Sequence, residues 1–114
     1  MEQVDRNSIL EHYKDVKKIS EVIGEWESGV VSVWECVINE CPITLKIKVK
    51  RIAPNTYIGV ANYGIAYPST HLSYRSMQPQ HSVHDALEDA LKGFLSSWKP
   101  EYKDQTKFEL DKNW

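Results

Sequence analysis

The sequence has few of the residues that turn small chains into disulfide-linked or zinc-linked domains. Its 114 residues include two cysteines, Cys36 and Cys41, which lie close together in the chain. A disulfide framework needs several cysteine pairs, and a structural zinc site needs a second pair of cysteines or histidines at matching spacing. We therefore expect two reduced structural thiols, and we expect no metal or other cofactor.

Long apolar runs and a surplus of one charge are also missing. No stretch of about 18 consecutive apolar residues occurs, and the first residues lack the basic and then apolar pattern of a secretion signal. The formal net charge is −2, from 14 basic and 16 acidic residues, so no global positive field attracts nucleic acid or an anionic membrane. We expect a cytoplasmic protein with neither nucleic acid nor a membrane as its partner.

The residues that are present suit a folded domain. Hydrophobic residues make up 41% of the chain and charged residues 26%, as in ordinary globular proteins. A chain of this length has room for one core, and we expect residues 1–100 to form a single α+β domain. Residues 101–114 are a C-terminal tail. Its alternation from Thr106 to Asp111 favours a short edge strand, whereas its many charges favour a loosely ordered end.

The second half of the chain contains the clearest helix signal. Ser82 followed by Asp85 is a capping-box pattern, in which side chains satisfy free N–H groups at the start of a helix. Apolar residues then recur at helical spacing: Val83, Ala86, Leu87, Ala90, Leu91, Phe94, Leu95 and Trp98. Pro100 ends the predicted helix, because proline cannot donate the next backbone hydrogen bond.

A similar pattern lies near the N-terminus. Ser8 and Glu11 form a second capping pair. Apolar residues follow at helical spacing until glycines interrupt them: Ile9, Tyr13, Val16, Ile19, Ile23 and Trp26. We therefore predict a first helix over residues 8–24.

Three β-rich segments separate the two predicted helices: residues 30–38, 43–52 and 56–66. Turn-forming residues lie between them, at positions 39–42 and at Pro54-Asn55. The middle segment alternates, with Ile43, Leu45, Ile47 and Val49 on one face and Thr44, Lys46, Lys48 and Lys50 on the other. The three segments predict an antiparallel meander with one apolar face.

Hydrophobicity and charge together set the register of the first hairpin. Pairing Ile38 with Ile43 brings apolar residues together on the inner face and places Glu35 opposite Lys46 on the outer face. The resulting inner pairs are Cys36 with Leu45, Trp34 with Ile47 and Ser32 with Val49.

A tight turn at Pro54-Asn55 continues the meander. In this register Ile58 and Val60 point inward, while Ala61 and Tyr63 point outward beside the lysines. Both predicted helices then cover the apolar face. The fold expected from the sequence is an α+β two-layer sandwich of order α-β-β-β-α, with a three-stranded antiparallel meander and a short C-terminal edge strand.

The loop before the second predicted helix is the best candidate for a binding site. A helix start offers free N–H groups and the positive end of the helix dipole, both of which attract anions. Polar, cationic and aromatic side chains gather there: Tyr74, Arg75, Ser76, Gln78, His81 and Ser82. We predict that they bind a small anionic ligand. In the alternative, Ser82 and Asp85 satisfy the helix start and Arg75 pairs with a neighbouring carboxylate.

A secondary surface lies on the outer face of the predicted sheet. Lys46, Lys48 and Lys50 form a basic row there, and Tyr63 adds a ring on which a base can stack. The alternative is that the lysines only keep this face in water. Three valines share the face in the predicted register: Val31, Val33 and Val37. A mixed apolar and basic interface for a protein partner, or for a second copy in a homo-oligomer, suits the same residues.

No group of residues predicts catalysis. His71, His81 and His84 are of a type that binds metals, but their spacing matches no metal-binding signature. The serines lack the surroundings of a catalytic nucleophile, and Cys36 lies within a core strand. We therefore expect neither enzymatic activity nor a metal site.

Two hypotheses about function follow. The leading one is a non-catalytic binding protein that captures or sequesters an anionic, nucleotide-like ligand at the loop before the second helix. The alternative is a protein-interaction or inhibitor module, for example a mobile-element accessory protein, that docks through the outer face or an edge of the sheet. The first predicts that Arg75→Ala abolishes ligand binding. The second predicts that charge reversal at Lys46 and Lys48 abolishes binding of a protein.

Overall fold

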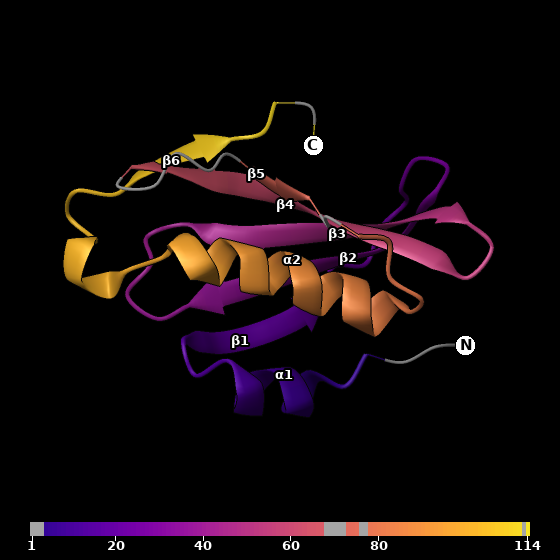
Figure 1. The fold of residues 1–114 in the computed structure, drawn as a ribbon, viewed down its shortest axis with the longest axis horizontal. Helices are drawn as coiled ribbons and strands as arrows, with labels where there is room; N and C mark the ends of the chain where they lie inside the picture. The colour runs from indigo at the N-terminus through magenta and orange to yellow at the C-terminus, as the bar shows by residue number, and fades with distance from the viewer. Residues whose placement is uncertain (1–3, 68–72, 76–77, 113) are drawn as a thin grey trace.

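The computed structural model describes residues 4–67, 73–75, 78–112 and 114 of the chain, shown in colour in Figure 1. Its elements in chain order are α1 (Arg6–His12), β1 (Val16–Glu21), β2 (Val30–Ile38), β3 (Thr44–Ala53), β4 (Thr56–Tyr67), β5 (Ser73–Arg75), α2 (Val83–Ser97), a short 3-10 helix η1 (Pro100–Tyr102) and β6 (Lys107–Leu110). The named strands form one antiparallel sheet. The predicted α+β class, with a meander and a short C-terminal strand, is confirmed.

Neighbouring strands of the sheet follow the chain, in the order β1-β2-β3-β4-β5, and β6 returns to pair with β4. The long β4 pairs along one edge first with β3 and then with β6. Asn62 lies where the partner changes. Its side-chain Oδ1 accepts a hydrogen bond from the backbone N–H of Lys46 at 2.8 Å, and its carbonyl accepts one from the N–H of Asp111 at 2.7 Å. Asn62 therefore links both partner strands to β4.

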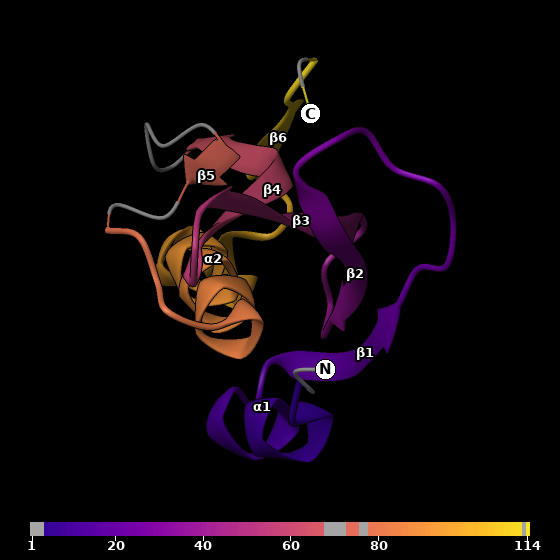
Figure 2. The same cartoon turned by 90° about the vertical axis from the view of Figure 1, so that its right-hand side faces the viewer.

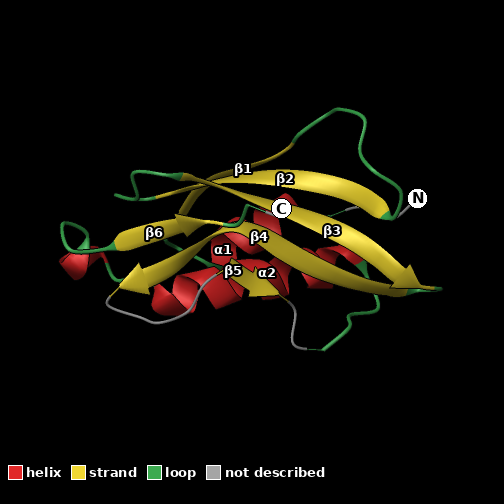
Figure 3. Cartoon of the chain, turned by 90° about the horizontal axis from the view of Figure 1, so that it is seen from above, coloured by secondary structure: helices red, strands yellow, loops and turns green. Residues whose placement is uncertain are grey.

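The sheet curls around α2, as Figure 2 shows, and α1 lies beyond β1. Seen from above the view of Figure 1, in Figure 3, the strands lie in front of both helices. The core fills the space between the concave face of the sheet and α2. Among its buried residues are Leu45, Ile47, Val49, Leu87, Leu91 and Phe94. We call the concave face the inner face and the opposite one the outer face.

The helix α2 begins and packs as its sequence predicts. The hydroxyl of Ser82 accepts a hydrogen bond from the N–H of Asp85 at 3.0 Å, and a cap of this kind stabilises a helix by about 1 kcal/mol. Gly59 of β4 lets the helix approach the sheet closely. A Cβ at this position would collide with the carbonyl oxygen of Ala86 and would lie 2.9 Å from the Cβ of Ala90. The close packing of β4 on α2 therefore requires glycine at position 59.

The predicted register of the first hairpin is confirmed. Trp34 pairs with Ile47 on the inner face, and Glu35 pairs with Lys46 on the outer face. The indole N–H of Trp34 donates to the hydroxyl of Ser32 at 2.9 Å, which satisfies two polar groups that this register buries.

The register of the second hairpin differs from the prediction by one residue. The turn at Pro54-Asn55 forms as predicted, but the register shifts at Ile52, just before it. Lys48 consequently pairs with Val60. The shift exchanges the two faces of β4, so the predicted orientation was wrong: Ala61 and Tyr63 lie on the inner face, and Ile58 and Val60 lie on the outer face.

The predicted first helix over residues 8–24 is wrong after its first turns, because α1 ends at His12 and a strand follows. Asp5, rather than Ser8, is the N-cap. Its carboxylate accepts a hydrogen bond from the backbone N–H of Ser8 at 3.0 Å. The actual helix therefore starts earlier than predicted and contains only two turns.

A β-bulge gives β1 the apolar spacing of a helix. Val16 and Ile19 are both buried although they are three positions apart, a spacing that places residues of a regular strand on opposite faces. The register between β1 and β2 shifts between Val16 and Lys18. The extra residue at this bulge turns both apolar side chains toward the core.

The C-terminal tail is joined to the body of the protein. β6 pairs with β4, and Phe108 packs against Trp98 with 5.9 Å between the ring centroids. The indole N–H of Trp114 donates to the carbonyl of Val60 at 2.7 Å. The tail therefore adds to the sheet as a strand and then crosses part of its outer face.

Candidate functional site

The residues predicted to bind an anion are assembled only in part. Tyr74 and Arg75 belong to β5, but their side chains lie outside the described residues, as does the whole of Ser76. Gln78 and His81 are exposed. The remaining member of the set, Ser82, caps α2.

The backbone of this segment is fixed to the start of β4. Tyr57 and Gln80 exchange two backbone hydrogen bonds of 2.8 Å each. The side-chain amide of Gln80 also donates to the carbonyl of Gln78 at 3.0 Å. The side chains of Gln78 and His81 therefore extend from a backbone that is held in place.

The first turns of α2 carry negative charge. The carboxylate of Asp85 lies in the first turn, where it already complements the positive end of the helix dipole. A cavity of about 200 Å³ beside these turns is lined by Tyr13, Gln80, Asp85, Glu88, Asp89 and Lys92. Three carboxylates and one ammonium group favour a cation in this cavity over an anion.

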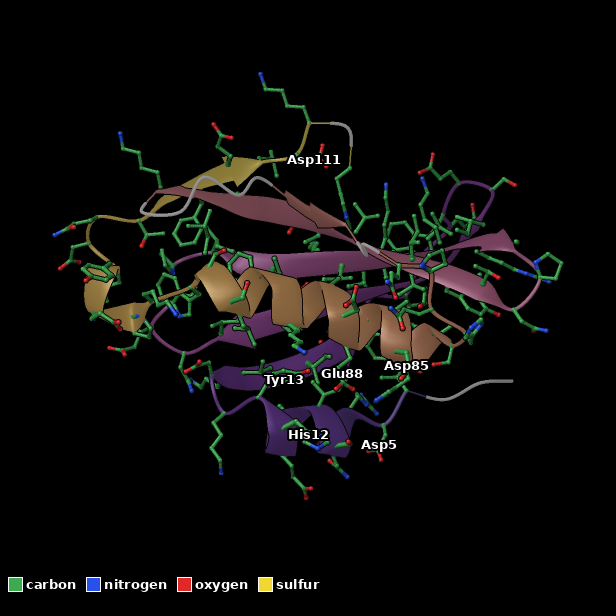
Figure 4. All side chains as sticks on the ribbon, viewed as in Figure 1. Asp5, His12, Tyr13, Asp85, Glu88 and Asp111 are labelled. Carbon is green, nitrogen blue, oxygen red and sulfur yellow. The ribbon has the colours of Figure 1, made fainter. Side chains whose placement is uncertain are left out.

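Glu88 is the centre of a hydrogen-bonded network that joins α1 to α2. Figure 4 shows Tyr13 and Glu88 between the two helices, where the Tyr13 hydroxyl donates to Glu88 Oε1 at 3.1 Å. His84 Nε2 lies 2.9 Å from Glu88 Oε2, and His84 Nδ1 accepts a hydrogen bond from the N–H of Asp5 at 3.2 Å. Because Nδ1 accepts, Nε2 carries the proton that His84 donates to Glu88.

The environment of Tyr13 makes it a hydrogen-bond donor and not a base. Burial raises the pKa of Tyr13 to about 12, and the hydrogen bond to Glu88 and the charges of Glu88 and Asp89 act in the same direction. The Oδ2 atom of Asp89 is shielded from solvent and has no hydrogen-bond partner among the described residues. The sequence predicted that His84 and Glu88 lie one helical turn apart, but it contained no signal that Tyr13 contacts Glu88.

The cysteines are inert. Cys36 is fully buried in the core, and burial raises the pKa of its thiol to about 12. Burial also raises the pKa of Cys41. Both thiols therefore stay protonated at neutral pH, so neither is an activated nucleophile.

The predicted basic row on the outer face is interrupted at its centre. Lys48 is only 6% exposed. Its Nζ donates to the carbonyl of Trp114 at 2.8 Å, lies 5.0 Å from the centroid of the Trp114 ring and is 3.4 Å from the carboxylate of Glu27. We call the contacts among Lys48, Trp114 and Glu27 the outer clasp. They leave Lys46 and Lys50 as separate, half-buried lysines.

Tyr63 does not belong to the lysine surface. It packs against the core from the inner face, because the bulge at Ile52 reverses the orientation of β4. The structure therefore separates Tyr63 from the three lysines with which the sequence grouped it.

The part of the outer face that the tail leaves bare carries exposed apolar residues. Six large apolar residues of the described chain are exposed, and four of them come from the β1–β2 loop and the adjoining parts of β2 and β3: Ile23 at 86%, Trp26 at 43%, Val31 at 45% and Ile52 at 53%. Val31 and Ile52 both lie where the strand register shifts. We call these four residues the bulge patch.

The β1–β2 loop is tied to the same region of the sheet. Gly29 accepts a hydrogen bond from the N–H of Arg51 at 2.8 Å, and Glu27 contacts Lys48 on the outer face. Figures 1 and 2 agree that the loop lies on the side of the sheet away from α2. The loop therefore lies next to the ends of β2 and β3 that carry the other exposed residues.

Sequence reasoning missed Ile52 and Trp114. The sequence did contain a signal for Ile52. Every second residue before it is a lysine, at positions 46, 48 and 50, so an apolar residue at position 52 breaks the polar pattern of that series. The contacts of Trp114 had no such signal, since they join residues that lie far apart in the chain.

Comparisons with known proteins do not assign the chain to a family. No protein-family model, curated protein or solved structure matches the chain. Across residues 4–67, 73–75, 78–112 and 114, no group of three or more His, Cys, Asp or Glu side chains is arranged to hold a metal ion. No helix within these ranges is long and apolar enough to span a bilayer.

Proposed function

We propose that the protein is a non-catalytic protein-interaction module that docks through the bulge patch on the outer face of its sheet. The observation that carries the proposal is the exposure of four large apolar residues around one end of β2 and β3. Contiguous exposed apolar surface is uncommon on small monomeric proteins and is typical of binding sites.

The local backbone supports this role. A β-bulge leaves one residue without a partner in the ladder and redirects its side chain. Val31 occupies such a position on β2, and Ile52 occupies one on the neighbouring β3. Both side chains are about half exposed.

The composition of the bulge patch fits recognition of a protein. Trp26 offers a large ring that is 43% exposed, and tryptophan is among the residues that contribute most to protein interfaces. Charged residues lie beside the apolar ones in the chain: Glu25 and Glu27 flank Trp26 on the loop, and Lys50 precedes Ile52 by two positions on β3. An apolar centre with a charged rim is the usual anatomy of a protein interface.

Crosslinking in the native host tests the proposal. A photoreactive residue at position 31 should form a specific crosslink to a protein, and the additional substitution Ile52→Asp should abolish it. Leu110→Asp is the matched control, because Leu110 is 57% exposed and lies on β6, outside the patch. A crosslink that survives Ile52→Asp, or that Leu110→Asp removes equally, would overturn the proposal.

We propose capture of a small anionic, nucleotide-like ligand at the segment before α2 as a second candidate function. It is supported by Gln78 and His81, which are exposed and extend from the backbone that the Tyr57–Gln80 bridge holds in place. Against it stands the negative charge around α2, from Asp85 and the residues that follow. For this reason the candidate ranks second.

Calorimetric titration with nucleotides and cyclic dinucleotides tests the second candidate. Saturable binding that is lost in Arg75→Ala and His81→Ala, but retained in the control His12→Ala on α1, would support it. An absence of binding heat with the wild-type protein would refute it. Neither result depends on the bulge patch, so the two candidates are tested separately.

A further inference from the structure

Hydrogen bonds attach both ends of α1 to α2. At the start of α1, the backbone N–H of Asp5, its N-cap, donates to Nδ1 of His84 at 3.2 Å. At the other end, the hydroxyl of Tyr13, the C-cap residue, donates to Glu88 Oε1 at 3.1 Å. Figure 4 shows Asp5 and Tyr13 on the α1 side of the gap between the helices and Glu88 on the other. The two attachments belong to one network, because His84 Nε2 lies 2.9 Å from Glu88 Oε2.

The two attachments respond differently to acid. Burial raises the pKa of Tyr13 to about 12, so its hydroxyl remains a donor to Glu88 in neutral and mildly acidic solution. Nδ1 of His84 accepts a hydrogen bond only while it carries no proton. Histidine side chains take up a second ring proton between about pH 8 and pH 5, and both ring nitrogens are then donors. A protonated Nδ1 would face the N–H of Asp5 as donor against donor.

The charged groups around His84 are acidic. Among the described residues, the carboxylate of Glu88 faces Nε2, and Asp85 follows His84 on the same helix. From α1, the carboxylate of Asp5 accepts the N–H of Ser8 at 3.0 Å and so serves as the cap. A protonated ring would therefore keep Glu88 as its partner in an ion pair, while its hydrogen bond with the Asp5 backbone would be lost.

The segment that His84 holds forms one wall of an open cavity of about 630 Å³. Val4 and Leu10 are partly buried there and pack against the core, and Ile19 belongs to the core itself. The lining residues come from the start of α1 and from β1: Val4, Asp5, Arg6, Asn7, Leu10 and Ile19. Movement of Asp5 away from His84 would therefore change the wall of this cavity.

We propose that His84 is a proton-operated latch on the start of α1. Neutral His84 holds the backbone of Asp5 and keeps the cavity wall in place. Protonated His84 stays with Glu88 and releases Asp5, so α1 loosens from its N-terminal end while Tyr13 still holds the other end. The latch is independent of the bulge patch, because it joins the two helices.

Nuclear magnetic resonance of the isotope-labelled full chain tests the latch in a titration from about pH 8 to about pH 5. At the alkaline end, the nitrogen chemical shift of His84 Nδ1 should be that of an unprotonated acceptor. As His84 takes up its proton, the amide proton of Asp5 should move upfield with the same midpoint. The Ile9 amide donates to the carbonyl of Asp5 at 3.3 Å. Its protection against hydrogen exchange should fall roughly fivefold, as expected for the loss of one hydrogen bond.

Three results would overturn the latch. One is a His84 that stays neutral throughout the titration, and another is a ring whose Nδ1 already carries the proton at the alkaline end. The third is an Asp5 amide, or an Ile9 protection factor, that does not change as His84 titrates.

Matched variants separate the latch from a general effect of acid. In His84→Ala the Asp5 amide should have its released chemical shift at every pH. Glu88→Gln removes the charge that partners the protonated ring, so the midpoint should move to lower pH. Asp5→Asn, which keeps a capping oxygen without the carboxylate charge, and His12→Ala, which removes a histidine of α1, should both retain the response at position 5. A response that persists in His84→Ala, or that His12→Ala removes, would contradict the assignment to His84.

Discussion

The two faces of the sheet are stabilised by different chemistry. On the inner face, apolar side chains of β2, β3 and β4 pack against α2, and the strand backbone approaches the helix at Gly59. On the outer face, a few directional contacts of Lys48 and Trp114 close the centre, and the bulge patch stays in solvent. The inner face therefore holds the fold together, whereas the outer face leaves large apolar side chains in contact with solvent.

The largest expected effect is on the inner face. Leu91 is fully buried on α2, so Leu91→Ala removes apolar contacts and leaves a cavity. We expect a loss of about 2 to 5 kcal/mol in the free energy of unfolding, measured by urea denaturation. A loss similar to that of an exposed leucine such as Leu110 would contradict the two-layer core.

Gly59 provides the second test of the inner face. The added methyl group of Gly59→Ala would meet the carbonyl oxygen of Ala86 and the Cβ of Ala90, and both belong to the helix. We expect the strand or the helix to shift at a cost of about 1 to 3 kcal/mol. Chemical denaturation measures this, and Gly93→Ala in the same helix is the control. Unchanged stability would show that α2 lies farther from β4.

The outer clasp should contribute less to the free energy of unfolding than the packing of the inner face. Lys48→Met keeps a long apolar side chain but removes the ammonium group that contacts Trp114. We expect a loss of about 1 kcal/mol, because the hydrogen bond and the cation–π contact disappear while the cost of burying a charge is also removed. Tryptophan fluorescence should shift to the red as Trp114 becomes more exposed. Stability equal to or above the wild-type value would show that the ammonium group does not hold the tail.

The network between α1 and α2 predicts a loss of stability in alkaline solution. Burial and Glu88 raise the pKa of Tyr13 from 10.0 to about 12, so the folded state keeps its proton after the unfolded state has lost it. The stabilising contribution of Tyr13 is therefore complete below pH 10 and is lost as the pH rises to about 12. Denaturation at pH 9 and pH 11.5 should show a smaller decrease for Tyr13→Phe than for the wild type.

The strands β2 to β4, the second helix and the register of the first hairpin were predictable because local signals agree with one another. The alternation of residues 43–50 and the pairing of Glu35 with Lys46 allow a single register. The cap and the apolar stripe of α2 are likewise contained in one short segment. Such features depend on neighbours in the chain, which a sequence displays directly.

Two errors of the sequence prediction come from β-bulges. At β1 a bulge places Val16 and Ile19 on one face, and this spacing resembles a helix. At Ile52 a bulge reverses the faces of β4 and moves Tyr63 into the core. In the candidate site, Ile52 could be predicted from the sequence because it breaks the alternation of the strand. The contacts of Trp114 could not be predicted, because they join residues far apart in the chain.

The smallest expected effect on stability is at the bulge patch, and it completes the comparison of the two faces. Ile52 is 53% exposed, so Ile52→Asp should change the free energy of unfolding by about 0.5 kcal/mol or less, as should Leu110→Asp. The two variants should unfold alike in urea but differ in binding, because only Ile52 lies in the patch. A large loss for Ile52→Asp alone would mean that the bulge is part of the core, and its effect on binding would then follow from unfolding. Unchanged stability together with lost binding is the result that assigns the inner face to folding and the outer face to recognition.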